Sequence, residues 1–245
     1  MKSEYVLLML FTVTQAVVAF DSRNISSAEW NCGLWPSSDS VTVSFESVSP
    51  PGPLVECGTE VFQNVSSAYQ SDSMPAVSYD TADVSALYTV LIVDRDASSA
   101  SNPSRSPIIH MALSNVPGDV LQYGISPSTI SDTVLSFFSY SGPQPPPGSF
   151  CHRYYIMLYS QDRSVTPQLN VSAVGRFNFD FPTWAKANSL TKLAVNYFQT
   201  QSNLSRTAGC NENPSPGKSG ASALVVNTLV SIAVAVASLM LLFTC

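Results

Sequence analysis

The chain has 245 residues, of which 11% are charged, and its formal net charge is −6 at pH 7. Soluble domains usually contain about 25% charged residues, so this chain relies on serine, threonine, asparagine and proline for polarity, as suits an extracellular protein. The acidic balance excludes a broad nucleic-acid-binding surface, because phosphate backbones require a basic face. The length allows one domain of about 180 residues once both ends are set apart.

Residues 1–19 have the pattern of a secretory signal peptide. Lys2 precedes an apolar run, and the small residues Val17 and Ala19 precede an expected cleavage at Phe20. The run is too short, and too interrupted by polar residues, for a good membrane span. We therefore expect export, with a mature domain over residues 20–210.

Sequons and cysteines follow the signal. Each Asn-x-Ser sequon predicts a surface position that can carry a glycan in an exported chain. The sequons begin at Asn24, Asn64, Asn170 and Asn203.

Export places the cysteines in an oxidising compartment, where disulfides are the default. The candidates are Cys32, Cys57, Cys151 and Cys210, and Cys245 stands at the end of the sequence. Four cysteines allow 3 pairings, and sequence alone does not choose among them. We favour Cys151 with Cys210 and Cys32 with Cys57. The chain has no Cys-x-x-Cys and only 2 histidines, which argues against a zinc site, and we expect no metal and no cofactor.

The middle of the chain predicts β-structure. Residues 88–93 form a short, β-branched, apolar run, which we interpret as a buried central strand. Further strand-like runs cover residues 41–45, 75–79, 108–113 and 154–159. Loops rich in serine, proline and glycine cover residues 98–107, 114–118 and 140–148. Only residues 184–201 show helical spacing of apolar side chains, so we expect a β-rich single domain with one late helix.

The C-terminal part of the sequence differs from this domain. Residues 211–222 form a polar spacer with proline and glycine, and residues 223–245 are largely apolar. A spanning helix is normally followed by cytoplasmic lysine or arginine, and here none follows. Ser219 and Gly220 supply the small residues that a glycosylphosphatidylinositol (GPI) attachment site requires. We expect GPI anchoring at the cell surface, with a retained single-pass helix as the alternative.

Candidate site residues stand beside the predicted strands. Asp94 and Asp96 follow the buried central strand, where a rigid element meets a loop, although both residues are also common turn formers. His110 and His152 stand against other strand-like runs, where a lone histidine is often structural. Tyr154 shares a strand face with His152, because side chains alternate along a strand. An imidazole beside a phenol can bind an anionic oxygen.

Familiar catalytic patterns are missing from the sequence. It has no Gly-x-Ser-x-Gly elbow, no His-Glu-x-x-His and no complete P-loop. We therefore predict no enzymatic activity. A hydrolase with a scattered triad, or with His110 or His152 as base, stays as an alternative, because a triad is defined by geometry and not by order.

Several motifs, in order, resemble the phosphatidylethanolamine-binding protein family, also called Raf kinase inhibitor-like proteins. The family motifs are Asp-Pro-Asp-Ala-Pro, His-Trp, Asn-Ile-Pro-Gly, and a Gly-Pro-rich loop ending in Gly-x-His-Arg-Tyr. The matching stretches here are Asp94-Arg-Asp-Ala-Ser98, His110-Met111, Asn115-Val-Pro-Gly118, and the loop 142–148 with Cys151-His-Arg-Tyr154. The resemblance runs from about residue 41 to residue 201, including a late Phe-rich segment and helix from Arg176.

The resemblance implies a mainly β fold, with a large antiparallel sheet packed on a smaller sheet and helices at the periphery. It also implies a small pocket at the sheet edge that accepts a phosphate or phospholipid head group, such as that of phosphatidylethanolamine, without turnover. The residues carried over to this pocket are Asp94, Asp96, His110, Pro146, His152 and Tyr154. The histidines and Tyr154 would hydrogen-bond phosphate oxygens, while Asp94 would orient an imidazole or accept from an ethanolamine ammonium.

The sequence departs from the family motifs at positions that bear on the pocket. Arg95 and Ser98 replace prolines, and Met111 replaces tryptophan. We expect Arg95 to add a cation near the pocket mouth, and a disulfide at Cys151 to fix the pocket wall. Because the family includes inhibitors of kinases and proteases, a regulator that docks on an extracellular protein is the alternative function.

Overall fold

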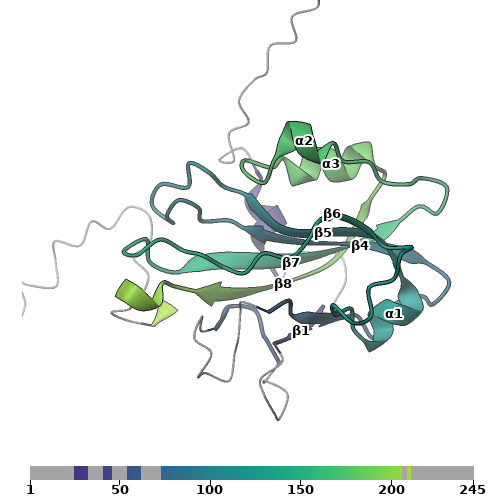
Figure 1. Cartoon of the computed structure of the whole chain (residues 1–245), viewed down its shortest axis with the longest axis horizontal. Coiled ribbons are helices and arrows are strands. Elements are labelled where there is room, and N and C mark those ends of the chain that lie inside the picture. The colour runs from purple at the N-terminus through teal and green to yellow at the C-terminus, as the bar shows by residue number, and fades with distance from the viewer. Residues whose placement is uncertain (1–24, 33–40, 46–53, 62–72, 206–208, 211–245) are drawn as a thin grey trace, which may run out of the picture.

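The structure is a computed structural model, and it describes residues 25–32, 41–45, 54–61, 73–205 and 209–210 (Figure 1). The expected signal peptide, the sequons at Asn24 and Asn64, the spacer, the candidate attachment residues Ser219 and Gly220, and the apolar end all lie outside these ranges. Within them, no helix is long and apolar enough to cross a membrane.

A six-stranded sheet forms the centre of the molecule, with strand order β2-β8-β7-β4-β5-β6. The strands are β2 (Thr59–Glu60), β4 (Leu87–Asp94), β5 (Ile108–Pro117), β6 (Leu135–Phe138), β7 (His152–Gln161) and β8 (Thr191–Thr200). Neighbours pair antiparallel, except that β2 runs parallel to β8. The large sheet is therefore mixed rather than purely antiparallel.

The predicted central strand is confirmed. Strand β4 pairs with β7 on one side and β5 on the other, and every residue after Leu87 is buried. At its end, Asp94 lies opposite Tyr154 of β7 and Ile108 of β5. The register thus brings the ends of three motif-bearing segments to one edge of the sheet.

Other elements cover both faces of this sheet (Figure 1). On one face lie a two-stranded sheet, β1 (Thr42–Ser44) with β3 (Ala76–Ser78), and helix α1 (Gly118–Tyr123). On the other face lie helices α2 (Val171–Val174) and α3 (Phe181–Ala187). Two short 3-10 helices, η2 (Ser27–Trp30) and η3 (Asn203–Ser205), complete the described elements. The strands expected at 41–45 and 75–79 are confirmed as β1 and β3.

Alternation along β7 divides the core into two clusters. Tyr154, Ile156 and Leu158 join the cluster under the small sheet, whereas Tyr155 and Met157 join the cluster under α3. A strand that is buried on both faces reads as a nearly continuous apolar run. This double coverage explains why the sequence shows little polar alternation in the central strands.

The helix predicted over residues 184–201 is confirmed only for residues 184–187, and the prediction is wrong for the residues after them. Helix α3 begins after Asp180, whose side chain accepts from the Thr183 N–H, and it ends at Ala187. Ser189 has a φ of 54°, and the chain then enters β8, which pairs with β7 from His152↔Thr200 to Ser160↔Thr191. Residues four positions apart lie on one face of a helix and also on one face of a strand. The spacing of apolar residues over 184–201 therefore did not distinguish a helix from a strand.

The loop predicted over residues 114–118 is also wrong. Strand β5 continues to Pro117, and α1, which we did not expect, starts at Gly118. A Cβ atom at Gly118 would lie 1.9 Å from the Asp83 carbonyl oxygen. The glycine therefore serves a close backbone approach at this junction, rather than a flexible loop.

The two disulfides join the cysteines in the pairing that we favoured. Cys32 bonds to Cys57, and Cys151 bonds to Cys210. The second bridge attaches the last described residue to the position just before His152. The first bridge holds the chain after η2, whose Trp30 packs edge-on against Tyr155 with ring centroids 5.0 Å apart.

Candidate functional site

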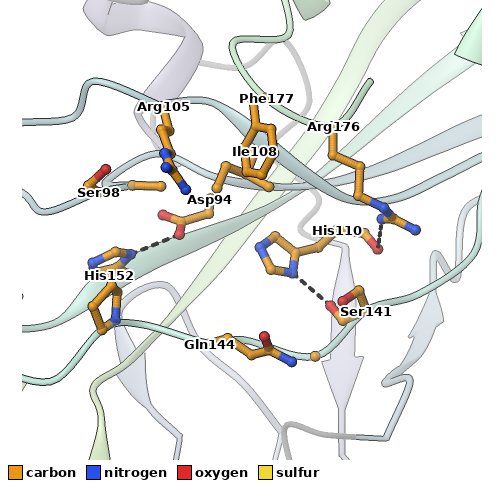
Figure 2. A pocket seen from close by; sticks show the side chains of 13 residues that line it. Asp94, Ser98, Arg105, Ile108, His110, Ser141, Gln144, His152, Arg176 and Phe177 are labelled. Carbon is orange, nitrogen blue, oxygen red and sulfur yellow. Dashed lines mark hydrogen bonds and ion pairs between the residues drawn. The ribbon is translucent and has the colours of Figure 1, made fainter. Parts of the chain in front are cut away.

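A cavity of about 310 Å³ lies where β4 ends, beside the starts of β5 and β7 (Figure 2). Its polar lining comes from Asp94, Ser98, Arg105, His110, Ser141, Gln144, His152 and Arg176. The remaining walls are Ala97, Ile108, Gly142, Pro146 and Phe177. The cavity therefore gathers four of the six predicted ligand-binding residues, Asp94, His110, Pro146 and His152.

Asp94 holds the imidazole of His152. The Asp94 Oδ2 atom accepts from His152 Nδ1 at 2.8 Å, and Oδ1 accepts from the Asp96 N–H at 2.7 Å. The side chains of Asp94 and His152 are only 4% and 1% exposed. Because both carboxylate oxygens already have partners, the structure assigns Asp94 the role of orienting an imidazole.

The other nitrogen of His152 meets Ser149. His152 Nε2 lies 3.0 Å from the Ser149 hydroxyl, which donates to the Pro146 carbonyl oxygen at 2.7 Å. Ser149 therefore holds the Nε2 side of the ring in place, while Asp94 holds the Nδ1 side. Asp94, His152 and Ser149 form a chain like a hydrolase triad, but Ser149 is 7% exposed and is not among the lining residues.

His110 is oriented by the backbone of the opposite wall. Its Nδ1 donates to the Ser141 carbonyl oxygen at 2.6 Å, and the Ser141 N–H donates to the His110 carbonyl oxygen at 2.9 Å. A carbonyl can only accept, so Nδ1 carries a proton. Burial lowers the pKa of His110, while the Ser141 contact opposes the shift. The ring is therefore neutral at pH 7, and its Nε2 is without a hydrogen-bond partner among the described residues.

Tyr154 lies behind the histidines rather than in the cavity wall. Its ring packs edge-on against His110, with centroids 5.0 Å apart, and stacks on Phe198 at 5.1 Å. Burial, followed by the charge of Asp94, raises the pKa of Tyr154 well above its usual value. Its hydroxyl is buried and has no hydrogen-bond partner in the described part of the chain. Tyr154 thus supports His110 as a neutral phenol.

Asp96 faces away from the cavity. Its Oδ1 accepts from Arg153 Nη2 at 2.6 Å, and its Oδ2 accepts from Arg153 Nε at 2.7 Å and from the Arg153 N–H at 2.9 Å. Asp96 is 2% exposed and is not among the lining residues. It therefore joins the end of β4 to the start of β7, parallel to the contact between Asp94 and His152.

The prediction that Arg95 places a cation at the mouth of the cavity is wrong, because Arg95 is not among the lining residues. The Arg95 guanidinium lies 5.1 Å from the centroid of the Trp30 ring. Alternation after the buried strand directs Asp94 and Arg95 to opposite faces, so Arg95 meets the cluster under α3. Met111, at the family's tryptophan position, is fully buried in the other cluster and does not line the cavity.

Two arginines that the sequence did not suggest line the cavity instead. Arg176 donates from Nη1 to the carbonyl oxygens of Ile109 and His110 at 3.0 and 3.3 Å, and from Nη2 to that of Ser139 at 3.0 Å. Arg105 is exposed and lies 5.4 Å from the centroid of the Phe177 ring. Arg176 begins the late segment of the family resemblance, but it is 66 residues from His110 in the sequence, and nothing local marked either arginine.

Among the described residues, no group of metal ligands with suitable spacing lies at this cavity. Among the described residues, the one group with suitable spacing is Glu60 with Cys151 and Cys210, whose ligand atoms lie within 4.8 Å of one another. The two cysteines form a disulfide, so they offer no thiolate to a metal ion.

A protein-family model described as phosphatidylethanolamine-binding protein matches residues 52–199, which include both motif regions and all the cavity residues named above. The chain belongs to the phosphatidylethanolamine-binding protein family. Members of this family are mostly non-catalytic binding or inhibitor proteins.

Curated relatives match part of the chain. Protein MOTHER of FT and TFL1 homolog 2 of Oryza sativa subsp. japonica is 32% identical over 116 residues, which cover 47% of this chain and 60% of the relative. Carboxypeptidase Y inhibitor of Saccharomyces cerevisiae is 28% identical over 132 residues, covering 47% of this chain and 59% of the relative. The chain thus matches 59–60% of the length of these relatives.

Solved structures share the fold. The phosphatidylethanolamine-binding protein from Plasmodium vivax has a TM-score of 0.53 at 16% identity, covering 68% of this chain and 89% of that one. The carboxypeptidase Y inhibitor complexed with its cognate proteinase has a TM-score of 0.50 at 20% identity, covering 68% and 84%. The expected family fold, mainly β with a large sheet packed on a small one, is confirmed.

Proposed function

We propose that this chain binds a small phosphorylated anion in the cavity beside Asp94, His110 and His152, and releases it unchanged. The observation that carries this proposal is the fixed pair of imidazoles. His152 is held at Nδ1 by a carboxylate, His110 is held at Nδ1 by a carbonyl, and both rings line one cavity. Free phosphorylated metabolites and phospholipid head groups are both possible sources of such an anion.

The chemistry of the lining suits phosphate oxygens, which act only as acceptors when ionised. His110 Nε2 donates once the ring takes up a proton. A ligand oxygen that replaces Ser149 would accept from His152 Nε2, and the guanidinium groups of Arg105 and Arg176 add positive charge. Hydrogen bonds between charged partners are about twice as strong as neutral ones.

The position of Ser149 supports binding over hydrolysis. Hydrolysis by a triad requires a serine hydroxyl that can reach the substrate. Ser149 is buried, its hydroxyl donates to Pro146, and His152 rather than Ser149 faces the cavity. The Asp94–His152–Ser149 chain therefore orients a binding group in this proposal.

We further propose that the protein is exported, glycosylated and held at the cell surface by a GPI anchor. The sequence of residues 1–19 and 211–245 is the basis for export and anchoring. Two disulfides are consistent with an oxidising compartment. Asn170 and Asn203, the sequons within the described residues, are both exposed.

A second candidate function is docking on an extracellular protein, in the manner of a protease inhibitor. The observation that favours it is the similarity to carboxypeptidase Y inhibitor, which has been solved in complex with its cognate proteinase. Competition between such a partner and phosphate would place the partner at the cavity, whereas independent binding would place it elsewhere.

Calorimetric titration of phosphoethanolamine into the purified protein tests the proposed function. We expect one weak site in the parent, no site in His152→Ala, and a weakened site in His110→Gln, which leaves the Asp94 pair intact. Circular dichroism confirms that each variant is folded. A folded parent without binding, or a His152→Ala protein that binds as the parent does, contradicts the proposal.

A further inference from the structure

The charged side chains that line the cavity are unequal in number. Among the described lining residues, Arg105 and Arg176 are cations, and Asp94 is the one carboxylate. With both imidazoles neutral, the lining carries one net positive charge, and each protonated imidazole adds another. Figure 2 shows Arg105 directed toward the Asp94 side of the cavity and Arg176 beside His110.

Asp94 is already committed to the protein. Its oxygens accept from His152 Nδ1 and from the Asp96 N–H. A ligand ammonium group would have to compete with these two buried contacts for its counter-charge. The lining therefore offers an anion two guanidinium groups, but offers a cation no uncommitted carboxylate among the described residues.

We infer that the cavity selects a small, soluble phosphate monoester over a phosphate diester, and that Arg105 determines this specificity. The inference rests on the proposed function and names the ligand class of the same site. A monoester carries a charge of about −1.5 to −2 at neutral pH and three terminal oxygens. A diester, such as a phospholipid head group, has a single negative charge and two terminal oxygens, and in ethanolamine lipids an ammonium cancels that charge.

The two arginines differ in what else they do. Arg176 donates to three backbone carbonyls, those of Ile109, His110 and Ser139, so its replacement would disturb the position of His110. Arg105 contacts the exposed Phe177 ring, and within the described chain no carboxylate pairs with it. Arg105 can therefore turn toward a ligand without breaking an ion pair, and it can be changed without disturbing the histidines.

Calorimetry with methyl phosphate and dimethyl phosphate tests the inference, because the two probes differ by one methyl group and one charge. At pH ~7.5 and low salt we expect the parent protein to bind methyl phosphate at least about tenfold more tightly. Arg105→Gln should lower the affinity for methyl phosphate by about three- to tenfold and leave that for dimethyl phosphate nearly unchanged. Arg163→Gln, a change in an exposed turn outside the cavity, is the matched control and should alter neither affinity.

Equal affinity of the parent for the two probes would overturn the inference, and so would an Arg105→Gln protein that keeps the full preference. If both probes bind equally at a site that His152→Ala abolishes, the proposed function stands and the ligand class is wrong. If neither probe binds the folded parent, the proposed function and the inference fail together.

Discussion

The imidazole of His110 links anion binding to pH. Burial lowers its pKa, and its Nδ1 proton is held by the Ser141 carbonyl, so the free ring presents the lone pair of Nε2. An anion near Nε2 favours the protonated ring and raises its pKa. By linkage, the affinity for an anion must increase as the pH falls through the pKa of His110.

Sulfate tests this coupling, because it remains a dianion at all the pH values needed. We expect sulfate affinity to rise between pH ~7.5 and pH ~5.5, by at most about tenfold per pH unit for one proton taken up. His110→Gln should remove most of that slope. Calorimetry in buffers of different ionisation enthalpy measures the proton uptake, and an affinity that is constant or rises with pH contradicts the account.

Asp94 and Asp96 occupy one motif but have different roles. Asp96→Ala leaves the guanidinium of Arg153, whose side chain is 33% exposed, without its carboxylate. We expect it to lower the free energy of unfolding by about 2–3 kcal/mol, with nearly unchanged anion affinity in the folded protein. Asp94→Asn should instead weaken anion binding strongly, because Asp94 orients His152. Denaturant unfolding and calorimetry on both variants separate the roles; loss of binding in folded Asp96→Ala would place Asp96 in the site.

The sequence predicted the cavity residues that belong to recognisable motifs and missed those that depend on packing. Asp94, His110 and His152 stand at strand ends with family motifs around them. The direction of Asp96 depends on a turn after β4, which gives its carboxylate to Arg153. Arg105 and Arg176 reach the cavity only because distant loops meet there, and no local pattern encodes such a meeting.

At the scale of elements, β7 joins the site to a disulfide. Cys151 precedes the first residue of β7, His152, and its partner Cys210 follows β8, which pairs with β7 along its length. The bridge therefore holds the start of β7 against the end of the described chain. The other bridge, Cys32–Cys57, holds η2 near β2 and does not reach the cavity lining.

Removing the two bridges separately should have different effects. A loop-entropy estimate gives about 4 kcal/mol for the 59-residue separation of Cys151–Cys210 and about 3.5 kcal/mol for the 25-residue separation of Cys32–Cys57. We expect Cys151→Ser with Cys210→Ser to lower both stability and phosphate affinity. Cys32→Ser with Cys57→Ser should lower stability alone. Thermal unfolding and calorimetry on both double variants test this, and equal loss of affinity in the two would show that the bridge beside His152 has no special role.

Element type was predictable where burial alone decides it. The run at β4 is so apolar and so short that only a buried strand fits, and the sequence indicated it. Strand β8 was mistaken for a helix because its identity depends on pairing with β7, which is a tertiary contact. The extension of β5 through residues 114–117 also depends on a tertiary contact, because the polar Ser114 is buried and hydrogen-bonded to Thr89 of β4.

The described part of the molecule is a sheet covered on both faces, with the cavity at one edge where the central strand ends (Figures 1 and 2). This arrangement leaves the site open to ligands while the covered faces supply rigidity. Its order of layers followed from the family resemblance and not from the composition. The ends of the chain lie outside the described residues, so export and anchoring stay predictions.

Anchoring can be tested on the intact protein in cells. We expect phosphatidylinositol-specific phospholipase C to release the protein from the cell surface, and deglycosylation to increase its mobility on a gel. Replacing Ser219 and Gly220 together with bulky residues should reduce the released fraction. Protein that remains with membranes after the enzyme treatment would favour the single-pass alternative, and protein found only inside cells would contradict export.

The central claim is that an anion binds between the two fixed imidazoles. The most direct measurement is a titration of inorganic phosphate followed by nuclear magnetic resonance of the ¹⁵N-labelled histidine side chains. We predict that His110 Nε2 shifts from the resonance of an unprotonated nitrogen toward that of a protonated one, while His110 Nδ1 stays protonated. Unchanged imidazole resonances at saturating phosphate, or shifts confined to amides away from the cavity, would contradict the account.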